Sequence, residues 1–266
     1  MGLSFIFRAV TFAFLLFFVY LAYVKKSGFI QTEETIGTEM NLVYPPLVLC
    51  SSISALLPFL ASAAIFKHSN KYSKSLVFLW IFFALSVVAE IILYILNSQK
   101  KQSAWVAPIY TLIEYVLISS VLADWQTKPA IARLMRISIP IYILFFVLIN
   151  VAGLENFSAK TVNYITRPLA VLVMSTFALL SLQALWSQTP TNLAGDYRFW
   201  MLLAMSLYYS TSLGLFAFMF TQDRDLLVAL LKIHAVVHII HNILFTIGVF
   251  RVRGANQTTP QPSSAS

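Results

Sequence analysis

Three histidines near the C-terminus, His234, His238 and His241, lie inside one apolar run from Leu226 to Phe250. Spacings of four and three residues place the three imidazoles on one face of a helix. A run of this length crosses a bilayer, where ionisable side chains are costly and face a protein interior or a water-filled cavity. Imidazoles can bind a metal ion, form hydrogen bonds and exchange a proton near neutral pH. The sequence therefore predicts a polar interior on this face of the last helix.

Two carboxylates lie in other apolar runs. Glu90 belongs to a polar stripe of the run 75–96, and Glu114 is near the centre of the run 105–123. At about 1.5 Å per residue, Glu90, Glu114 and His234 are expected roughly 9–14 Å below the same outer face. We therefore expect one outward-facing pocket, with each carboxylate protonated or paired, because a bare charge in hydrocarbon costs several kcal/mol. Ser86, Tyr94 and Asn97 belong to the same stripe as Glu90, and Tyr110 lies one turn before Glu114. Tyr208 is a further polar residue, in the run 199–220.

The expected pocket has two chemical interpretations. In the first it binds a small or lipid ligand through Glu90, Tyr94, Tyr110, Glu114, Tyr208, His234 and His238, or a zinc or iron ion through His234, His238 and Glu114. In the second these side chains only hydrogen-bond to one another and hold the helices together. Asn150 and Asn242 are expected to make such helix–helix contacts.

The three histidines are not expected to be equivalent. His234 is the closest in depth to both glutamates and is near enough to the outer surface for a ligand to reach it. His241 lies about 10 Å deeper by helical rise. We therefore expect replacement of His234 or Glu114 to abolish ligand binding. Replacement of His241, whose expected role is packing or helix–helix contact, mainly lowers stability.

Composition determines the class of protein. The chain has 59% hydrophobic and 11% charged residues and a mean hydropathy of +0.80, whereas a soluble domain carries about a quarter charged residues. Apolar runs recur near 4–24, 42–66, 75–96, 105–123, 136–151, 168–186, 199–220 and 226–250. These predict an all-α, polytopic transmembrane bundle. It comprises an N-terminal anchor or signal segment with a polar linker (1–41), seven core helices (42–250) and a disordered tail (251–266).

The basic residues predict the orientation of this bundle. More of the Lys and Arg residues fall on the side that holds Lys74, Lys128, Arg136 and Arg251 than on the other. Because cytoplasmic loops are enriched in Lys and Arg, we place that side, with the C-terminus, in the cytoplasm. The formal charge of +8 is spread over loops beside the membrane, which indicates contact with lipid headgroups and excludes nucleic acid as a partner.

The pair His234 and His238, with the sequence His-Ala-Val-Val-His, resembles the HxxxH of the seven-helix superfamily of alkaline ceramidases and progestin and adipoQ receptors. That resemblance implies an intramembrane zinc ion with these two histidines as ligands. The chain departs from the family pattern in two ways. Its only other histidine, His68, is in a basic loop at the opposite face, and the family's intramembrane aspartate would have to be replaced by Glu90 or Glu114.

A longer similarity runs from about Leu42 to Phe250. It rests on Ala89-Glu90-Ile91, on the run Ile109–Glu114, and on an ending that includes His234, His241, Asn242 and Gly248. In these residues the chain resembles a group of uncharacterised seven-helix inner-membrane proteins of Bacteroidetes-type bacteria. This implies a bacterial inner-membrane location and a common pocket, but no established activity. In that group the pattern includes His234 and Asn242 rather than His238, which argues against an obligatory metal site.

Three functions follow from these features, in order of preference. The first is a non-enzymatic bundle whose pocket binds a small or lipid ligand in a sensory or accessory role. The second is a metal-dependent hydrolase acting on a lipid, with a metal-bound water as nucleophile and Glu90 or Glu114 as base. The third is a transporter, for which broken helices and inverted repeats would be the signs.

Overall fold

The computed structural model describes residues 45–66, 73–99, 105–155, 165–188, 193–218 and 224–257. Within these residues there is no β-strand, and seven helical segments are long and apolar enough to cross a membrane. The all-α membrane bundle predicted from the sequence is thereby confirmed. The predicted N-terminal segment 1–41 and the tail beyond residue 257 lie outside the described residues. The helices are α3 (Pro45–Ser54), α4 (Leu56–Phe66), α5 (Lys74–Ser98), α6 (Val106–Trp125), α7 (Pro129–Val151), α8 (Thr166–Gln188), α9 (Tyr197–Phe218) and α10 (Arg224–Gln257).

Two helix boundaries differ from those predicted. Helix α7 begins at Pro129 rather than at Arg136, because proline at the first helical position starts the helix before the apolar run. Arg133 and Arg136 lie on the exposed side of its first turns. Helix α10 reaches Gln257 and not Phe250, so the first residues of the predicted disordered tail are helical.

The first described span, Pro46–Ile65, is interrupted at its centre. Helix α3 ends at Ser54 and α4 begins at Leu56, and Ala55 donates its backbone N–H to the carbonyl of Ser52 at 3.2 Å. Pro58 has no N–H to give to the carbonyl of Ser54, and its ring crowds that carbonyl. Pro58 therefore accounts for the break.

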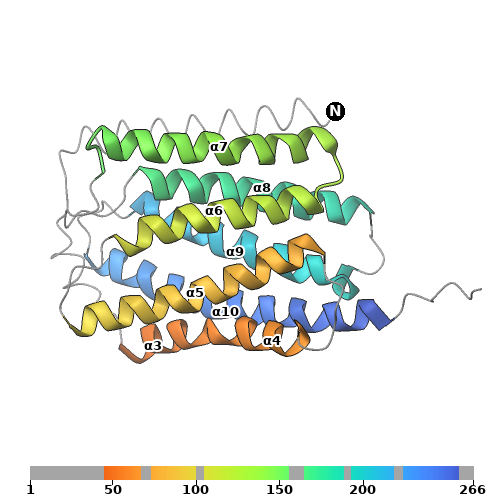
Figure 1. The fold of residues 1–266 in the computed structure, drawn as a ribbon. Helices are drawn as coiled ribbons and strands as arrows, with labels where there is room; N and C mark the ends of the chain where they lie inside the picture. Colours follow the sequence, from red (N-terminus) through yellow and green to blue (C-terminus); the bar gives the residue numbers. More distant parts are fainter. Residues whose placement is uncertain are drawn as a thin grey trace, which may run out of the picture.

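By their contacts the spans form a ring with one helix, α7, outside it; Figure 1 shows α7 at the edge of the bundle. Around the ring, α3/α4 packs on α5, α5 on α6, α6 on α8, α8 on α9, α9 on α10, and α10 back on α3/α4. Helix α7 lies at the edge of the bundle, against α6 and α8. The helices of the ring therefore enclose a common interior from which α7 is excluded.

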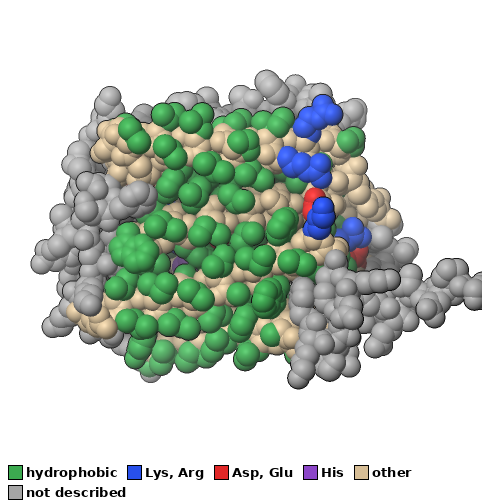
Figure 2. All heavy atoms as spheres, viewed as in Figure 1, with side chains coloured by type: hydrophobic (Ala, Val, Ile, Leu, Met, Phe, Trp, Pro, Cys, Tyr) green, Lys and Arg blue, Asp and Glu red, His purple; other side chains and the backbone are tan. Residues whose placement is uncertain are grey.

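The surface agrees with a membrane environment. Figure 2 shows a broad apolar band with Lys and Arg side chains gathered at one end of the molecule. The exposed apolar residues include Ile141, Leu144 and Leu148 of α7, each more than half exposed. Lipid chains are the natural cover for such a band.

Two local contacts fix how helices meet. Gly248 of α10 faces α9 so closely that an added Cβ would lie 2.8 Å from the Cγ of Met201 and 3.2 Å from the carbonyl oxygen of Tyr197. Glu155, 4% exposed, caps the start of α8. Its carboxylate accepts the backbone N–H groups of Ile165 at 2.6 Å and Thr166 at 3.0 Å, and the Thr166 hydroxyl at 2.6 Å.

Candidate functional site: a polar cavity within the bundle

A cavity lies inside the ring, at the middle of the spans. Tyr208 is near the midpoint of α9, and Ala55 is the residue at the break between α3 and α4. The cavity therefore lies deeper than the outward pocket predicted from the sequence, at the depth of His238 and His241. Its lining residues come from every member of the ring except α8: Ala55, Pro58, Phe82, Phe83, Ser86, Tyr110, Glu114, Tyr208, His238, His241 and Asn242.

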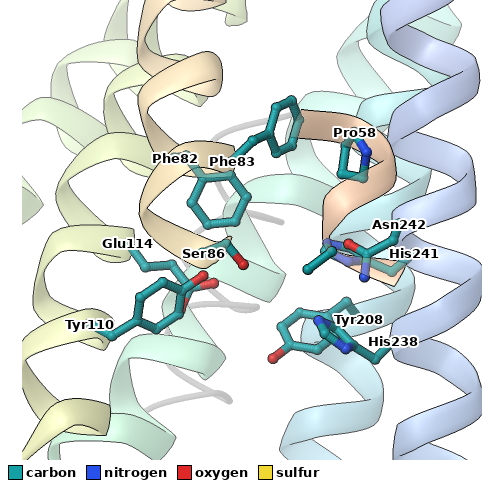
Figure 3. A pocket seen from close by; sticks show the side chains of 11 residues that line it. Pro58, Phe82, Phe83, Ser86, Tyr110, Glu114, Tyr208, His238, His241 and Asn242 are labelled. Atoms are coloured by element: carbon teal, nitrogen blue, oxygen red, sulfur yellow. The ribbon is translucent and has the colours of Figure 1, made fainter. Parts of the chain in front are cut away.

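The polar and the apolar side chains of the lining lie in separate places (Figure 3). Ser86, Tyr110 and Glu114 form one polar wall, on α5 and α6, with their oxygen atoms close together. The opposite polar wall consists of side chains from α9 and α10, namely Tyr208, His238, His241 and Asn242. Phe82, Phe83 and Pro58 close one end of the space between them. The site is therefore amphipathic, with two hydrogen-bonding walls and an apolar end.

Glu114 is the carboxyl group of the first wall. It is 6% exposed, and its Oε1 accepts a hydrogen bond of 3.0 Å from the hydroxyl of Tyr209. This bond joins α6 to α9 across the ring. The sequence prediction that Glu114 faces the interior and contacts a polar side chain is confirmed.

Helix α10 is tied to the broken span by two hydrogen bonds. The Ser51 hydroxyl and Nδ1 of His238 are 2.8 Å apart, and either atom donates according to the histidine tautomer. Nδ2 of Asn242 donates to the Ser54 hydroxyl at 2.8 Å, and this hydroxyl donates to the carbonyl of Ser51 at 2.6 Å. The predicted helix–helix role of Asn242 is thereby confirmed. Asn150 instead donates to the carbonyl of Phe146 in its own helix, at 2.8 Å.

The ring of Tyr208 lies against the whole histidine face. Its centroid is 5.4 Å from that of His234, 5.5 Å from that of His238 and 4.6 Å from that of His241, the last pair being stacked. His241 also meets Phe245 edge-on at 4.4 Å. Contact with this phenol ring positions the three histidines, but their ring nitrogens must form hydrogen bonds with other groups.

His241 is 4% exposed, and within the described part of the chain neither of its ring nitrogens has a hydrogen-bond partner. Nδ1 of the partly buried His234 also lacks one. The expectation that His241 packs is correct, but it makes no hydrogen bond that would hold helices together. Buried polar groups are nearly always hydrogen-bonded, so an exception calls for an explanation.

Several residues predicted for the pocket lie elsewhere. Tyr94 is 70% exposed, on the outside of α5. Glu90 is half-buried and His234 is partly buried, and neither lines the cavity, although Glu90 is within electrostatic range of His238. Tyr110, Glu114, Tyr208 and His238 do line it. His234 therefore lies outside the lining of this cavity, and the predicted loss of binding on its replacement stays a prediction.

The cavity lining also includes seven residues that were not in the predicted site: His241, Asn242, Ser86, Phe82, Phe83, Ala55 and Pro58. Asn242 follows His241 directly, and both are at helical spacing from His238, so the polar face of α10 could have identified them. Pro58, the break-forming residue, was a second signal. Phe82 and Phe83 could not have been singled out, because apolar residues are common throughout this sequence.

The predicted metal set is not assembled. Across the described ranges, no three His, Cys, Asp or Glu side chains are grouped so that they could hold a metal ion. The physical reason is the arrangement around Tyr208. The three imidazoles lie against its ring, with His241 alone of the three stacked on it, and Glu114 is on the opposite wall, hydrogen-bonded to Tyr209. Neither zinc nor iron is supported by this donor geometry.

The cavity is small in this conformation. The hollow and its mouth together enclose about 300 Å³, of which about 10 Å³ can hold the centre of a water molecule. That is room for about one water. Figure 2 shows a histidine side chain at depth in a gap of the apolar face, so the interior is not fully sealed on this side.

The fold and this cavity define a polytopic helical membrane protein with a polar site at mid-membrane. Comparison of the chain with protein-family models, with curated proteins and with solved structures found no match. The two family resemblances noted from the sequence therefore stay predictions, and function is inferred from the cavity and its residues.

Proposed function

We propose that this protein is a membrane-embedded ligand-binding protein with a sensory or accessory role. Its ligand is a small amphipathic molecule, held in the mid-membrane cavity. The polar part of the ligand would lie between the wall of Glu114 and the wall of His241, and its apolar part would lie against Phe82 and Phe83. This amphipathic lining is typical of small-molecule sites, in which a few polar groups fix orientation.

This proposal rests on one observation: the two ring nitrogens of His241 have no hydrogen-bond partner among the described residues. Asn242 and Glu114 bond to neighbouring helices, as residues that hold helices together are expected to do. Other buried polar side chains also lack a partner, among them Thr111 and Ser206, but among the described residues only His241 both lacks partners at two atoms and lines the cavity. A fully buried imidazole at a cavity wall without such a bond is destabilising by about 1–3 kcal/mol. A binding role explains why a polar side chain occupies this position.

Binding requires the cavity to widen, and the broken span offers a way. Ala55 and Pro58 line the cavity and belong to the interruption between α3 and α4. Hinges are a few residues at the ends of elements that absorb the backbone change. A small change of angle between α3 and α4 would move Ala55 and Pro58 away from the opposite walls.

The test uses four compounds that share a benzene ring and differ in the group attached to it. Benzyl alcohol, benzylamine, benzoate and toluene are titrated into the full-length protein in lipid nanodiscs, and thermal stability is measured. We expect at least one polar-headed probe to raise the melting temperature of the wild type, with toluene having a smaller effect. Ala55→Leu, which fills the cavity, should abolish the shift while leaving Cys50 labelling on the exposed face of α3 unchanged.

Two outcomes would reject the ligand site. In one, no probe distinguishes the wild type from Ala55→Leu, which means that the probes only partition into lipid. In the other, toluene matches the polar probes, which means that the polar walls do not take part in binding.

Transport is the second candidate, and the break in the first described span favours it. Interrupted helices near the bilayer midplane form the substrate sites of many secondary transporters. The two roles differ in one measurement: in proteoliposomes, counterflow of the radiolabelled probe that binds supports transport, and binding without counterflow supports the sensory role.

We also propose a bacterial inner-membrane location with the C-terminus in the cytoplasm. The described basic residues support this orientation, because Lys74, Lys128, Arg198 and Arg251 are all at the end where α10 finishes. A reporter fused after Arg253 is expected to be cytoplasmic, and one inserted at Gln102 external. Paired alkaline phosphatase and fluorescent-protein fusions measure this, and a cytoplasmic signal at Gln102 would reverse the orientation.

A further inference from the structure

The imidazole of His241 has no hydrogen-bond partner among the described residues, and it borders a cavity. Both ring nitrogens lack a hydrogen-bond partner among the described residues, and the side chain is 96% buried, being 4% exposed. A neutral imidazole has one N–H donor and one acceptor nitrogen. The side chain of the adjacent Asn242 interacts with this ring without completing a hydrogen bond of normal geometry, so the cavity that His241 lines is the open source of a partner.

The volume and the polar lining of the cavity are those of a site for a single water molecule. Its room of about 10 Å³ for water centres is close to what a single water molecule requires. Buried waters make about three hydrogen bonds to polar groups that would otherwise be unsatisfied, whereas cavities that stay empty are apolar. Here hydroxyl and carboxyl oxygens of Ser86, Tyr110 and Glu114 face the imidazole across the space.

We propose that this cavity binds a single ordered water molecule that bridges His241 to the wall formed by Ser86, Tyr110 and Glu114. The water bonds to one nitrogen of His241 and makes its remaining bonds to oxygens of the opposite wall. It thereby joins α10 to α5 and α6, helices that share no hydrogen bond at this level among those observed in the described residues. It also satisfies part of the buried polar surface that the protein side chains leave open.

The water site has a consequence for the ligand, which rests on the proposed function. A ligand group that displaces an ordered water without reproducing its hydrogen bonds loses affinity. A hydroxyl group, like water, donates and accepts, whereas an ammonium group only donates and a carboxylate only accepts. The ligand class is therefore a small amphipathic alcohol, and benzyl alcohol should outrank benzylamine and benzoate in the nanodisc titration.

The test of the water site is independent of any ligand. The chain has four histidines, so ¹⁵N-histidine-labelled protein in lipid bilayers gives few side-chain signals, each assigned by replacing one residue. Magnetisation transfer from water protons to the ring nitrogens is then measured by solid-state NMR. We expect transfer to His241, and loss of that transfer in the cavity-filling variants Ala55→Leu and Ser86→Leu.

His234 is the internal control, because it lies outside the cavity lining and its signal should be the same in the wild type and both variants. Two results overturn the proposal: no transfer to His241 in the wild type, or transfer that persists when the cavity is filled. If either filling variant does not fold, the other serves alone. A water at His241 without any probe binding would reject the proposed ligand site but not the water site.

Discussion

Replacement of Glu155 by alanine is expected to lower the free energy of unfolding by about 2–4 kcal/mol, because the backbone N–H groups of Ile165 and Thr166, at the start of α8, lose the only acceptor found for them among the described residues. The carboxylate receives two backbone N–H groups and one hydroxyl while almost fully buried. It is also negative at the positive end of a helix dipole. Reversible unfolding in mixed micelles, followed by tryptophan fluorescence, measures the loss.

Glu155→Gln is the matched variant for this prediction. It keeps one oxygen acceptor and the shape of the side chain, so its loss should be clearly smaller than that of alanine. Equal and small losses for both variants would show that water replaces the carboxylate at the start of α8.

Gly248→Val is expected to destabilise the protein by about 2–3 kcal/mol, through overpacking between α9 and α10. The first added carbon alone would approach Met201 Cγ to 2.8 Å, and the backbone oxygen of Tyr197 cannot move without shifting α9. The same unfolding measurement applies. Because His238 and His241 are on this helix, probe binding should also weaken.

Gly214→Val provides the comparison, since nothing lies within 4 Å of a Cβ added at Gly214 in α9. The two substitutions change intrinsic helix propensity equally. Their difference therefore measures the helix–helix contact, and equal unfolding midpoints would mean that α9 and α10 separate at no cost.

The sequence predicted the spans well because hydrocarbon requires long apolar helices, and composition alone identifies them. It predicted the site less well because depth and face are properties of the packed bundle. The stripe on α5 is an example. At about 100° per residue, Tyr94 is turned about 80° from Ser86, so Ser86 enters the cavity while Tyr94 is exposed.

The ranking of the histidines was limited in the same way. Counting residues from the end of an apolar run assumes that all helices start at one plane, and it takes no account of what they pack against. Tyr208 covers the face on which all three imidazoles lie, and the open space is beside His238 and His241. Which histidine meets a cavity therefore depends on the shape of the neighbouring helices, which residue spacing within one helix does not encode.

The length of α10 gives the site a mechanical connection to one side of the membrane. The helix that carries His241 runs without interruption to Gln257, beyond the end of its apolar span at Val252. From His241 to that end is about 24 Å of helix. A tilt of about 5° at the cavity would displace the far end by about 2 Å. A change at the site that is too small to alter the shape of the bundle would therefore move the end of this helix outside the bilayer.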